Sequence, residues 1–198
     1  MAAGKYLERL RLTLHGCSAA PTAVDFNRDS RTNLSILSSF SSILELGSGT
    51  GLAGIAAATT FQNANAVLTD LDIALPALRH NVSLNRHAIG DRVSVKECDW
   101  EIPSEDVLKG PYDCIIAADC VWLEHLVKPF VSTVRKVFDY NPTATGFLAY
   151  QSRTKRVDAL LFSQFLGAGI LVQKAPLLPG EPSRGKIDIY CLLKEPAG

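Results

Sequence analysis

The sequence predicts an α/β fold with a mostly parallel β-sheet, and three observations support this class. From residue 42 onward, short β-branched or leucine-rich runs alternate with longer helical patterns, which is typical of βαβ units. The run Asp113–Ala118 is nearly all apolar, as expected of a central parallel strand that is covered on both faces. A glycine-dense turn lies between the first predicted strand and the first predicted helix. The 198 residues are enough for one such domain with its own core.

Seven strands and four helices follow from these patterns. The predicted strands are Ser42–Leu46, Ala66–Thr69, Val93–Lys96, Asp113–Ala118, Gly146–Tyr150, Gly169–Lys174 and Lys186–Leu193. The predicted helices are Leu52–Thr60, Ile73–Arg86, His125–Tyr140 and Val157–Leu166. In the third helix Leu126, Phe130, Val134 and Val137 recur at steps of three and four residues, so one face should pack on the sheet.

The two ends of the chain depart from the βαβ pattern. Residues 175–185 are too rich in proline and glycine for a crossover helix, so the last two strands should form an antiparallel hairpin at the sheet edge. Residues 1–41 show no strong period and are interpreted as an irregular lead-in or lid. The sequence therefore predicts one domain over residues 42–198, with helices on both faces of a seven-stranded sheet.

Composition excludes several classes of protein. Twenty basic residues balance 20 acidic ones, which disfavours non-specific nucleic-acid binding. The five cysteines are scattered and form no C-x-x-C pair, which argues against a disulfide framework and a zinc site and favours a reducing, cytoplasmic setting. No apolar run has the roughly 18 residues that a membrane span needs, and no signal peptide is evident. We expect a monomer, because nothing indicates an obligate assembly.

The strongest chemical signal is Ile43-Leu-Glu-Leu-Gly-Ser-Gly-Thr-Gly-Leu-Ala-Gly54, in which a strand runs through a glycine-dense turn into a helix. Glycines let the backbone approach a ligand closely, and the helix presents free N–H groups. Gly49-x-Gly51-x-x-Gly54 also satisfies the dinucleotide fingerprint, so the pattern alone does not choose a cofactor. A tight turn without a ligand is the simplest alternative.

Two carboxylates near the glycine loop help to distinguish between possible cofactors. Asp70 closes the second predicted strand, where an acid accepts hydrogen bonds from a ribose diol. Glu45 ends the first strand, beside the place of a dinucleotide's pyrophosphate, and its charge would repel phosphate. It would suit a cationic ligand such as S-adenosylmethionine, so the sequence favours this cofactor over a nicotinamide dinucleotide.

Five segments occur in an order that resembles a known family: Glu45-Leu-Gly-Ser-Gly-Thr-Gly51, Thr69-Asp70, Asn81-Val-x-x-Asn85, Asp99-Trp100 and Ala118-Asp-Cys-Val-Trp-Leu-Glu124. Together they resemble the small protein-lysine methyltransferases, often described as nicotinamide N-methyltransferase-like, of the seven-stranded Rossmann-like class. The resemblance covers roughly residues 43–193 and implies a class I methyltransferase that uses S-adenosyl-L-methionine.

The resemblance also implies a cofactor site. Glu45, Gly47, Ser48 and Gly49 would hold the amino-acid part, Asp70 the ribose and Leu71 one face of the adenine. Asp99 and Trp100 would lie at the adenine edge and rim, and Ala118 would line the floor. Trp100 could instead be a half-buried loop anchor.

The family segment after the fourth strand ends Asp-x-x-Tyr, and here it reads Asp119-Cys-Val-Trp122. The candidate catalytic residues are Asp119, which would orient the acceptor amine, and Trp122, which would stack on the lysine stem or its cation. Glu124 either contacts the acceptor or only complements the dipole of the following helix.

A tryptophan-containing segment usually precedes the glycine loop in this family, but no tryptophan precedes residue 100 here. Residues 27–33 occupy that region, so either a divergent lid replaces the segment or part of the N-terminal half is missing.

The resulting hypothesis is an N-methyltransferase acting on a lysine of a protein substrate, by resemblance a chaperone, an ATPase or a translation factor. A small-molecule N-methyltransferase, a catalytically inactive binding subunit and, last, a nicotinamide-dependent dehydrogenase are the alternatives.

Overall fold

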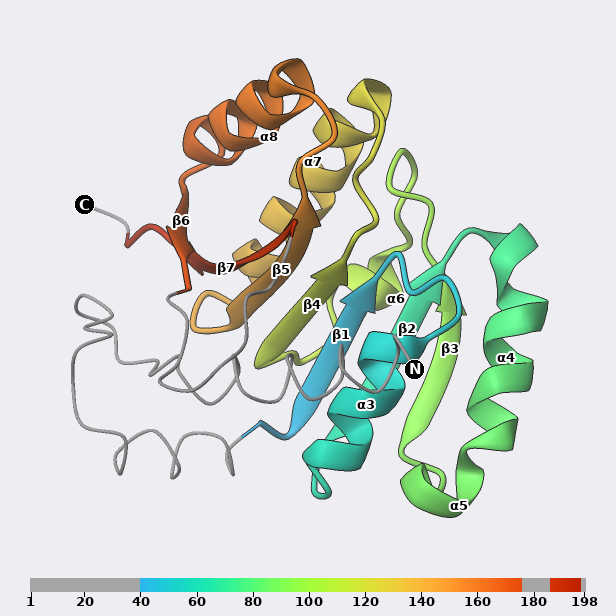
Figure 1. Ribbon diagram of the computed structural model, residues 1–198. Helices are drawn as coiled ribbons and strands as arrows, with labels where there is room; N and C mark the ends of the chain where they lie inside the picture. The colour runs from blue at the N-terminus through green and yellow to red at the C-terminus, as the bar shows by residue number, and fades with distance from the viewer. Residues whose placement is uncertain (1–39, 176–185, 197–198) are drawn as a thin grey trace, which may run out of the picture.

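A single seven-stranded sheet organises the molecule (Figure 1). The computed structural model describes residues 40–175 and 186–196. The strands are β1 (Ser42–Leu46), β2 (Asn65–Asp70), β3 (Val93–Glu97), β4 (Cys114–Ala118), β5 (Thr145–Gln151), β6 (Ile170–Lys174) and β7 (Ile187–Lys194). Their spatial order is β3-β2-β1-β4-β5-β7-β6, and the first five in this order are parallel.

The predicted edge hairpin is confirmed. β7 pairs antiparallel with β6, which forms the edge of the sheet, and also with β5. β7 therefore lies between β5 and β6. The proline- and glycine-rich connection falls at residues 176–185, outside the described residues, as does the lead-in before Phe40.

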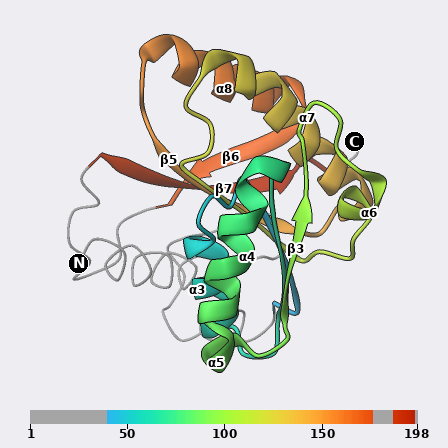
Figure 2. The same cartoon turned by 90° about the vertical axis from the view of Figure 1, so that its right-hand side faces the viewer.

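Helices cover both faces of the sheet, as predicted. They are α3 (Leu52–Thr60), the 3-10 turn η1 (Asp72–Ala74), α4 (Leu75–Leu84), α5 (Arg86–Ile89), α6 (Glu105–Leu108), α7 (Glu124–Tyr140) and α8 (Lys155–Gly167). Figure 2 shows β3 between α4 on one side and α6 and α7 on the other.

Successive side chains of each strand point to opposite faces of the sheet, so a hydrophobic core forms on each face. Leu44, Leu46 and Ile115 pack with buried side chains of α7 and α8. Ile43 and Ile116, which point the other way, pack with α3, α4 and α5. β4 is buried on both faces up to its last residue, which agrees with its apolar sequence and its position as the central strand of the sheet.

The predicted helix Ile73–Arg86 is wrong as one element, because it divides into η1, α4 and α5. Pro76 lies in the first turn of α4, where its missing N–H and its ring are tolerated. Asn85 ends α4, and its Nδ2 donates to the Asn81 carbonyl at 2.8 Å. The four-residue α6 is absent from the predictions, since it is shorter than the helical repeat can reveal.

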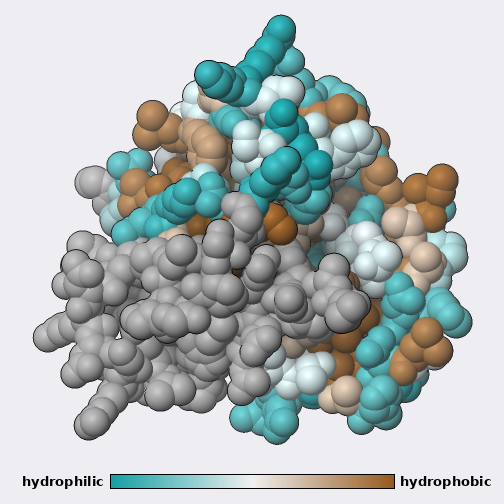
Figure 3. All heavy atoms as spheres, in the orientation of Figure 1, coloured by the Kyte–Doolittle hydropathy of each residue, from teal (hydrophilic) through white to brown (hydrophobic). Residues whose placement is uncertain are grey.

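Hydrophobic and hydrophilic side chains are mixed on the visible part of one face of the molecule. The face in Figure 3 carries its hydrophobic side chains in separate patches among hydrophilic ones. Within the two described ranges, no helix combines the length and the apolar character that crossing a membrane requires.

Candidate functional site

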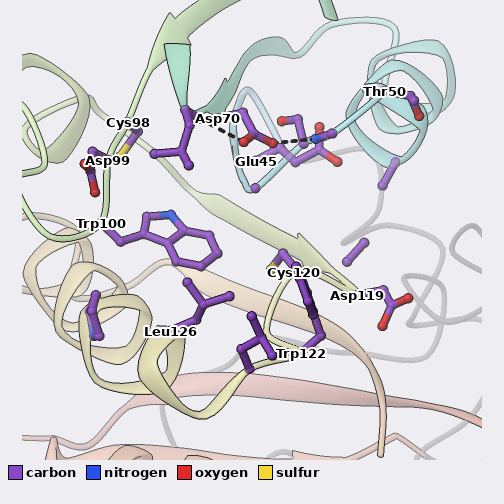
Figure 4. A pocket seen from close by; sticks show the side chains of 18 of the residues that line it. Glu45, Thr50, Asp70, Cys98, Asp99, Trp100, Asp119, Cys120, Trp122 and Leu126 are labelled. Atoms are coloured by element: carbon purple, nitrogen blue, oxygen red, sulfur yellow. Dashed lines mark hydrogen bonds between the residues drawn. The ribbon is translucent and has the colours of Figure 1, made fainter. Parts of the chain in front are cut away.

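A cavity of about 760 Å³ opens at the carboxyl ends of β1, β2, β3 and β4, where ligands bind in open α/β sheets (Figure 4). Residues from four stretches of the chain, one at the end of each of these strands, line it. They are Glu45, Gly47, Ser48, Gly49, Thr50, Leu52, Ala53, Asp70, Leu71, Cys98, Asp99, Trp100, Glu101, Ala118, Asp119, Cys120, Trp122, Leu123, His125, Leu126 and Pro129. This volume suits a ligand of nucleoside size.

The glycine loop between β1 and α3 packs so closely against the segment after β4 that it leaves no room for a side chain at Gly47. Gly47 has φ +68°, and a Cβ there would lie 2.6 Å from the Cys120 Cβ. The Ser48 N–H donates to the Thr69 carbonyl at 2.9 Å, and the Thr69 N–H donates to the Ser48 Oγ at 3.0 Å. These two bonds fix the loop against the end of β2, so its backbone is held in place before a ligand binds.

Glu45 is an almost completely buried carboxylate at the floor of this loop, with 1 % exposure. Its Oε2 lies against Gly54 of α3 and has no hydrogen-bond partner. Burial raises the pKa of Glu45 to about 7, and the charge of Asp70 adds to the rise, while hydrogen bonds from Ser48 and the Gly54 backbone lower it. A buried acid with an unused oxygen is a ready partner for a cationic ligand group.

Asp70 ends β2 and faces the same loop. Its Oδ2 accepts from the Gly49 N–H at 2.7 Å, and its Oδ1 accepts from the Leu71 N–H at 2.8 Å. Asn81 of α4 supports the loop from the other side, because its Nδ2 donates to the Thr50 carbonyl at 2.9 Å. The family resemblance included Asn81 without giving it a role, and the structure shows that it supports the loop.

Trp100 and Asp99 follow β3 and form another wall (Figure 4). The Trp100 ring lies 5.0 Å from that of Phe130, centroid to centroid, and its buried Nε1 has no hydrogen-bond partner. Asp99 Oδ1 accepts from the Glu101 N–H at 2.9 Å, which shapes the turn. Trp100 is thus half-buried, as a loop anchor would be, and also lines the cavity.

Asp119 and Trp122 lie after β4, and Figure 4 shows them on the other side of Cys120 from Asp99. The Trp122 side chain is 53 % exposed, and about half of the Asp119 side chain is exposed. Arg153 pairs with Asp119, because its Nη2 lies 2.7 and 2.8 Å from the two carboxylate oxygens.

Glu124 begins α7 and pairs with Arg156 at 2.8 Å. Its position agrees with the helix-dipole interpretation, and Glu124 is not among the residues that line the cavity.

All eleven candidate residues from the sequence line the same cavity. Sequence reasoning missed Leu126 and Pro129, whose contribution depends on how α7 docks on the sheet, and the Arg153 pairing with Asp119. Cys98 and Cys120 also line it, and burial raises the pKa of both thiols, that of Cys98 to about 11, as expected of apolar fillers.

The strand order, the glycine loop after β1 and the acid after β2 define a class I, Rossmann-like methyltransferase fold. Solved structures agree. An apo S-adenosylmethionine-dependent methyltransferase called SibL superposes with a TM-score of 0.59 over 98 % of this chain and 70 % of its own, at 15 % identity. An O-methyltransferase family protein from Burkholderia thailandensis superposes with a TM-score of 0.57 over 84 % of this chain and 56 % of its own, at 13 % identity.

Comparison of sequences gives the family. Residues 18–165 match the family model described as lysine methyltransferase, so the chain belongs to the lysine methyltransferase family. It is 34 % identical to EEF1A lysine methyltransferase 3 of Mus musculus, over 63 % of this chain and 51 % of the relative. It is 37 % identical to the protein N-lysine methyltransferase METTL21A of the same species, over 65 % of this chain and 48 % of the relative. The chain spans about half the length of the curated relatives it matches.

Proposed function

We propose that this chain binds S-adenosyl-L-methionine in the cavity and transfers its methyl group to a lysine side chain of a protein substrate. The family and the fold support the cofactor, and the names of the relatives support a protein acceptor. The observation that carries the proposal is the joint lining of one cavity by Glu45, Asp70 and Asp119.

The residues present fit the cofactor. The unused oxygen of the buried Glu45 suits its ammonium group, and Asp70 is an acceptor for ribose hydroxyls. Leu71, Asp99 and Trp100 would enclose the adenine, with the N–H groups of the glycine loop at the amino-acid end. When bound, the cofactor would supply an electrophilic methyl carbon, and the electron pair of the carbon–sulfur bond would stay on sulfur when the acceptor nitrogen takes the methyl group.

The protein's own contribution is placement of the acceptor. Asp119 and Trp122 are exposed at the mouth of the cavity, where a side chain carried by another protein can reach them. Asp119 would hold the nitrogen, and the indole of Trp122 would pack on the methylene stem. A cytoplasmic location belongs to the same proposal, with the scattered cysteines as its support.

Transfer of labelled methyl groups to protein tests the proposal. The purified chain is incubated with cell extract and S-adenosylmethionine labelled in the methyl group, and acid-precipitable protein is separated from soluble molecules. Asp119→Asn is the matched control, because asparagine tolerates the left-handed backbone of this position. We expect a labelled protein band that the control lacks, with S-adenosylhomocysteine still bound by both proteins in calorimetry. Label confined to the soluble fraction would favour a small-molecule acceptor, and binding without transfer would favour a binding subunit.

A further inference from the structure

The carboxylate proposed to receive the acceptor already has a cationic partner. Arg153 Nη2 contacts both oxygens of Asp119, and the side chains are 38 % and 47 % exposed. An acceptor amine that reaches Asp119 therefore meets an ion pair.

The segment that carries Arg153 is fixed on both sides. Tyr150 donates its hydroxyl to Asp158 Oδ1 at 2.7 Å, and Ser152 donates its hydroxyl to Asp158 Oδ2 at 2.6 Å. Thr154 caps α8, since its hydroxyl accepts from the Val157 N–H at 3.2 Å. The backbone at Arg153 is thus held between two anchored neighbours, and the guanidinium is positioned before any substrate arrives.

Asp119 is fixed as well. Among the non-glycine residues in the described ranges, it alone has a positive φ, of 51°. Its N–H donates to the Ala149 carbonyl of β5 at 2.8 Å. A left-handed backbone costs about 1 kcal/mol or more and persists where the surroundings enforce it. Both partners of the pair are therefore held in place by their own segments.

Charges near the cavity would otherwise oppose methyl transfer. Among the described residues that line the cavity, none is lysine or arginine. Five are carboxylates, namely Glu45, Asp70, Asp99, Glu101 and Asp119. His125 is also part of the lining, and the Arg156–Glu124 pair and Asp158 adjoin the Arg153 segment. A carboxylate beside an amine favours the ammonium form, which has no lone pair and cannot attack.

We propose that Arg153 is a positioning residue that controls the protonation of the acceptor amine by balancing the charge of Asp119. The inference rests on the proposed function. With the guanidinium in place, the amine meets a nearly neutral pair and releases its proton to water, and its lone pair then forms the bond to the methyl carbon. The product is a methylated ammonium, so charge is conserved.

Removing the guanidinium should have opposite effects on binding and turnover. In Arg153→Gln, the unbalanced carboxylate would bind the lysine ammonium more tightly but keep it protonated. A unit charge a few ångströms away changes a pKa by about one unit at a partly solvated site. The acid limb of the kcat profile should therefore move up by about one pH unit. Because the ordinary pKa of a lysine amine is about 10.4, this shift gives about a tenfold loss of kcat across the acid limb, which Arg153→Lys should restore.

The test uses the full chain and the protein labelled in the extract experiment, purified. The kcat at saturating acceptor is measured from pH 6.5 to 10. Affinity of the acceptor for the enzyme loaded with S-adenosylhomocysteine is measured by calorimetry at pH 7.5. Arg153→Lys keeps the charge and should keep the profile of the unmodified protein. Arg156→Gln removes the neighbouring guanidinium, paired with Glu124, and should not move the acid limb.

The outcomes distinguish a failure of the proposed function from a failure of the inference about Arg153. If the unmodified protein labels no protein, the proposed function fails, and the inference fails with it. If it labels one but Arg153→Gln keeps its acid limb, or binds the acceptor more weakly, the Arg153 pair is only a structural tie between two loops. A uniform loss at every pH that Arg153→Lys does not restore would have the same meaning.

Discussion

Replacing Glu45 by glutamine should remove a large pH dependence from the stability of the protein. The Glu45 side chain is 1 % exposed, and its pKa rises from 4.5 to about 7 mainly because burial disfavours the charged form. Below pH 4.5 the group is protonated in both the folded and the unfolded chain and has no effect. Between pH 4.5 and 7 the unfolded chain releases a proton that the folded protein retains, so stability falls as the pH rises. Above pH 7 the full cost is present.

The magnitude follows from the difference between the two pKa values. It corresponds to about 3 kcal/mol in total, of which about 2 to 3 kcal/mol is lost between pH 5 and pH 8. Glutamine has nearly the same shape and no proton to lose, so all other titrating groups contribute equally in both proteins.

Urea unfolding at pH 5 and pH 8 measures this difference. We expect the unfolding free energy of the unmodified protein to fall by about 2 to 3 kcal/mol more than that of Glu45→Gln over this interval. The same pH dependence in both proteins would refute the reasoning, because Glu45 would then titrate in the folded state as it does in the unfolded chain.

Further predictions concern the cofactor loop and the core. Calorimetric affinity for S-adenosylhomocysteine should fall by up to about tenfold per pH unit below pH 7, and this dependence should vanish in Glu45→Gln, since the ligand's ammonium requires the charged carboxylate. Asp70→Ala should weaken the same affinity by about 1.5–3 kcal/mol, and an unchanged value would remove Asp70 from the site. Gly54→Ala should lower the melting temperature, because its Cβ would meet Glu45 and lie 2.7 Å from Leu68, and overpacking costs about 1–3 kcal/mol. Gly167→Ala in α8, where a Cβ meets nothing within 4 Å, is the matched control and should be neutral or slightly stabilising. Phe165→Ala should cost about 3–5 kcal/mol in urea unfolding, since its side chain is fully buried against Phe130, and a loss below about 1 kcal/mol would contradict the packing.

Local patterns located most of the secondary structure. β1 and α3 have the predicted bounds, because a short apolar run, a glycine-dense turn and an alanine-rich run each have one obvious structure. The helix predicted from Ile73 failed because its breaks depend on single residues, Pro76 and Asn85, that do not disturb the apolar period. Interruptions of this kind are decided by hydrogen bonds, which the periodicity does not record.

The candidate site was predictable where its residues follow strands. Parallel strands bring their carboxyl ends to one edge, so Glu45, Asp70, Asp99 and Asp119 had to meet once the fold class was known. The chemistry of these groups was less predictable. The high pKa of Glu45 follows from its burial, where α3 brings Gly54 against the carboxylate. The sequence pattern does not predict this contact.

By itself, the sequence determined the fold class, the glycine loop and the acids at the strand ends, because all of these depend on residues close together in the chain. The tertiary structure alone decided that β7 lies between β5 and β6 and that Arg153 reaches Asp119, which is 34 residues away. Both depend on which distant segments pack together. That choice is made by the burial of whole surfaces and the pairing of whole strands, for which no short stretch of sequence carries the information.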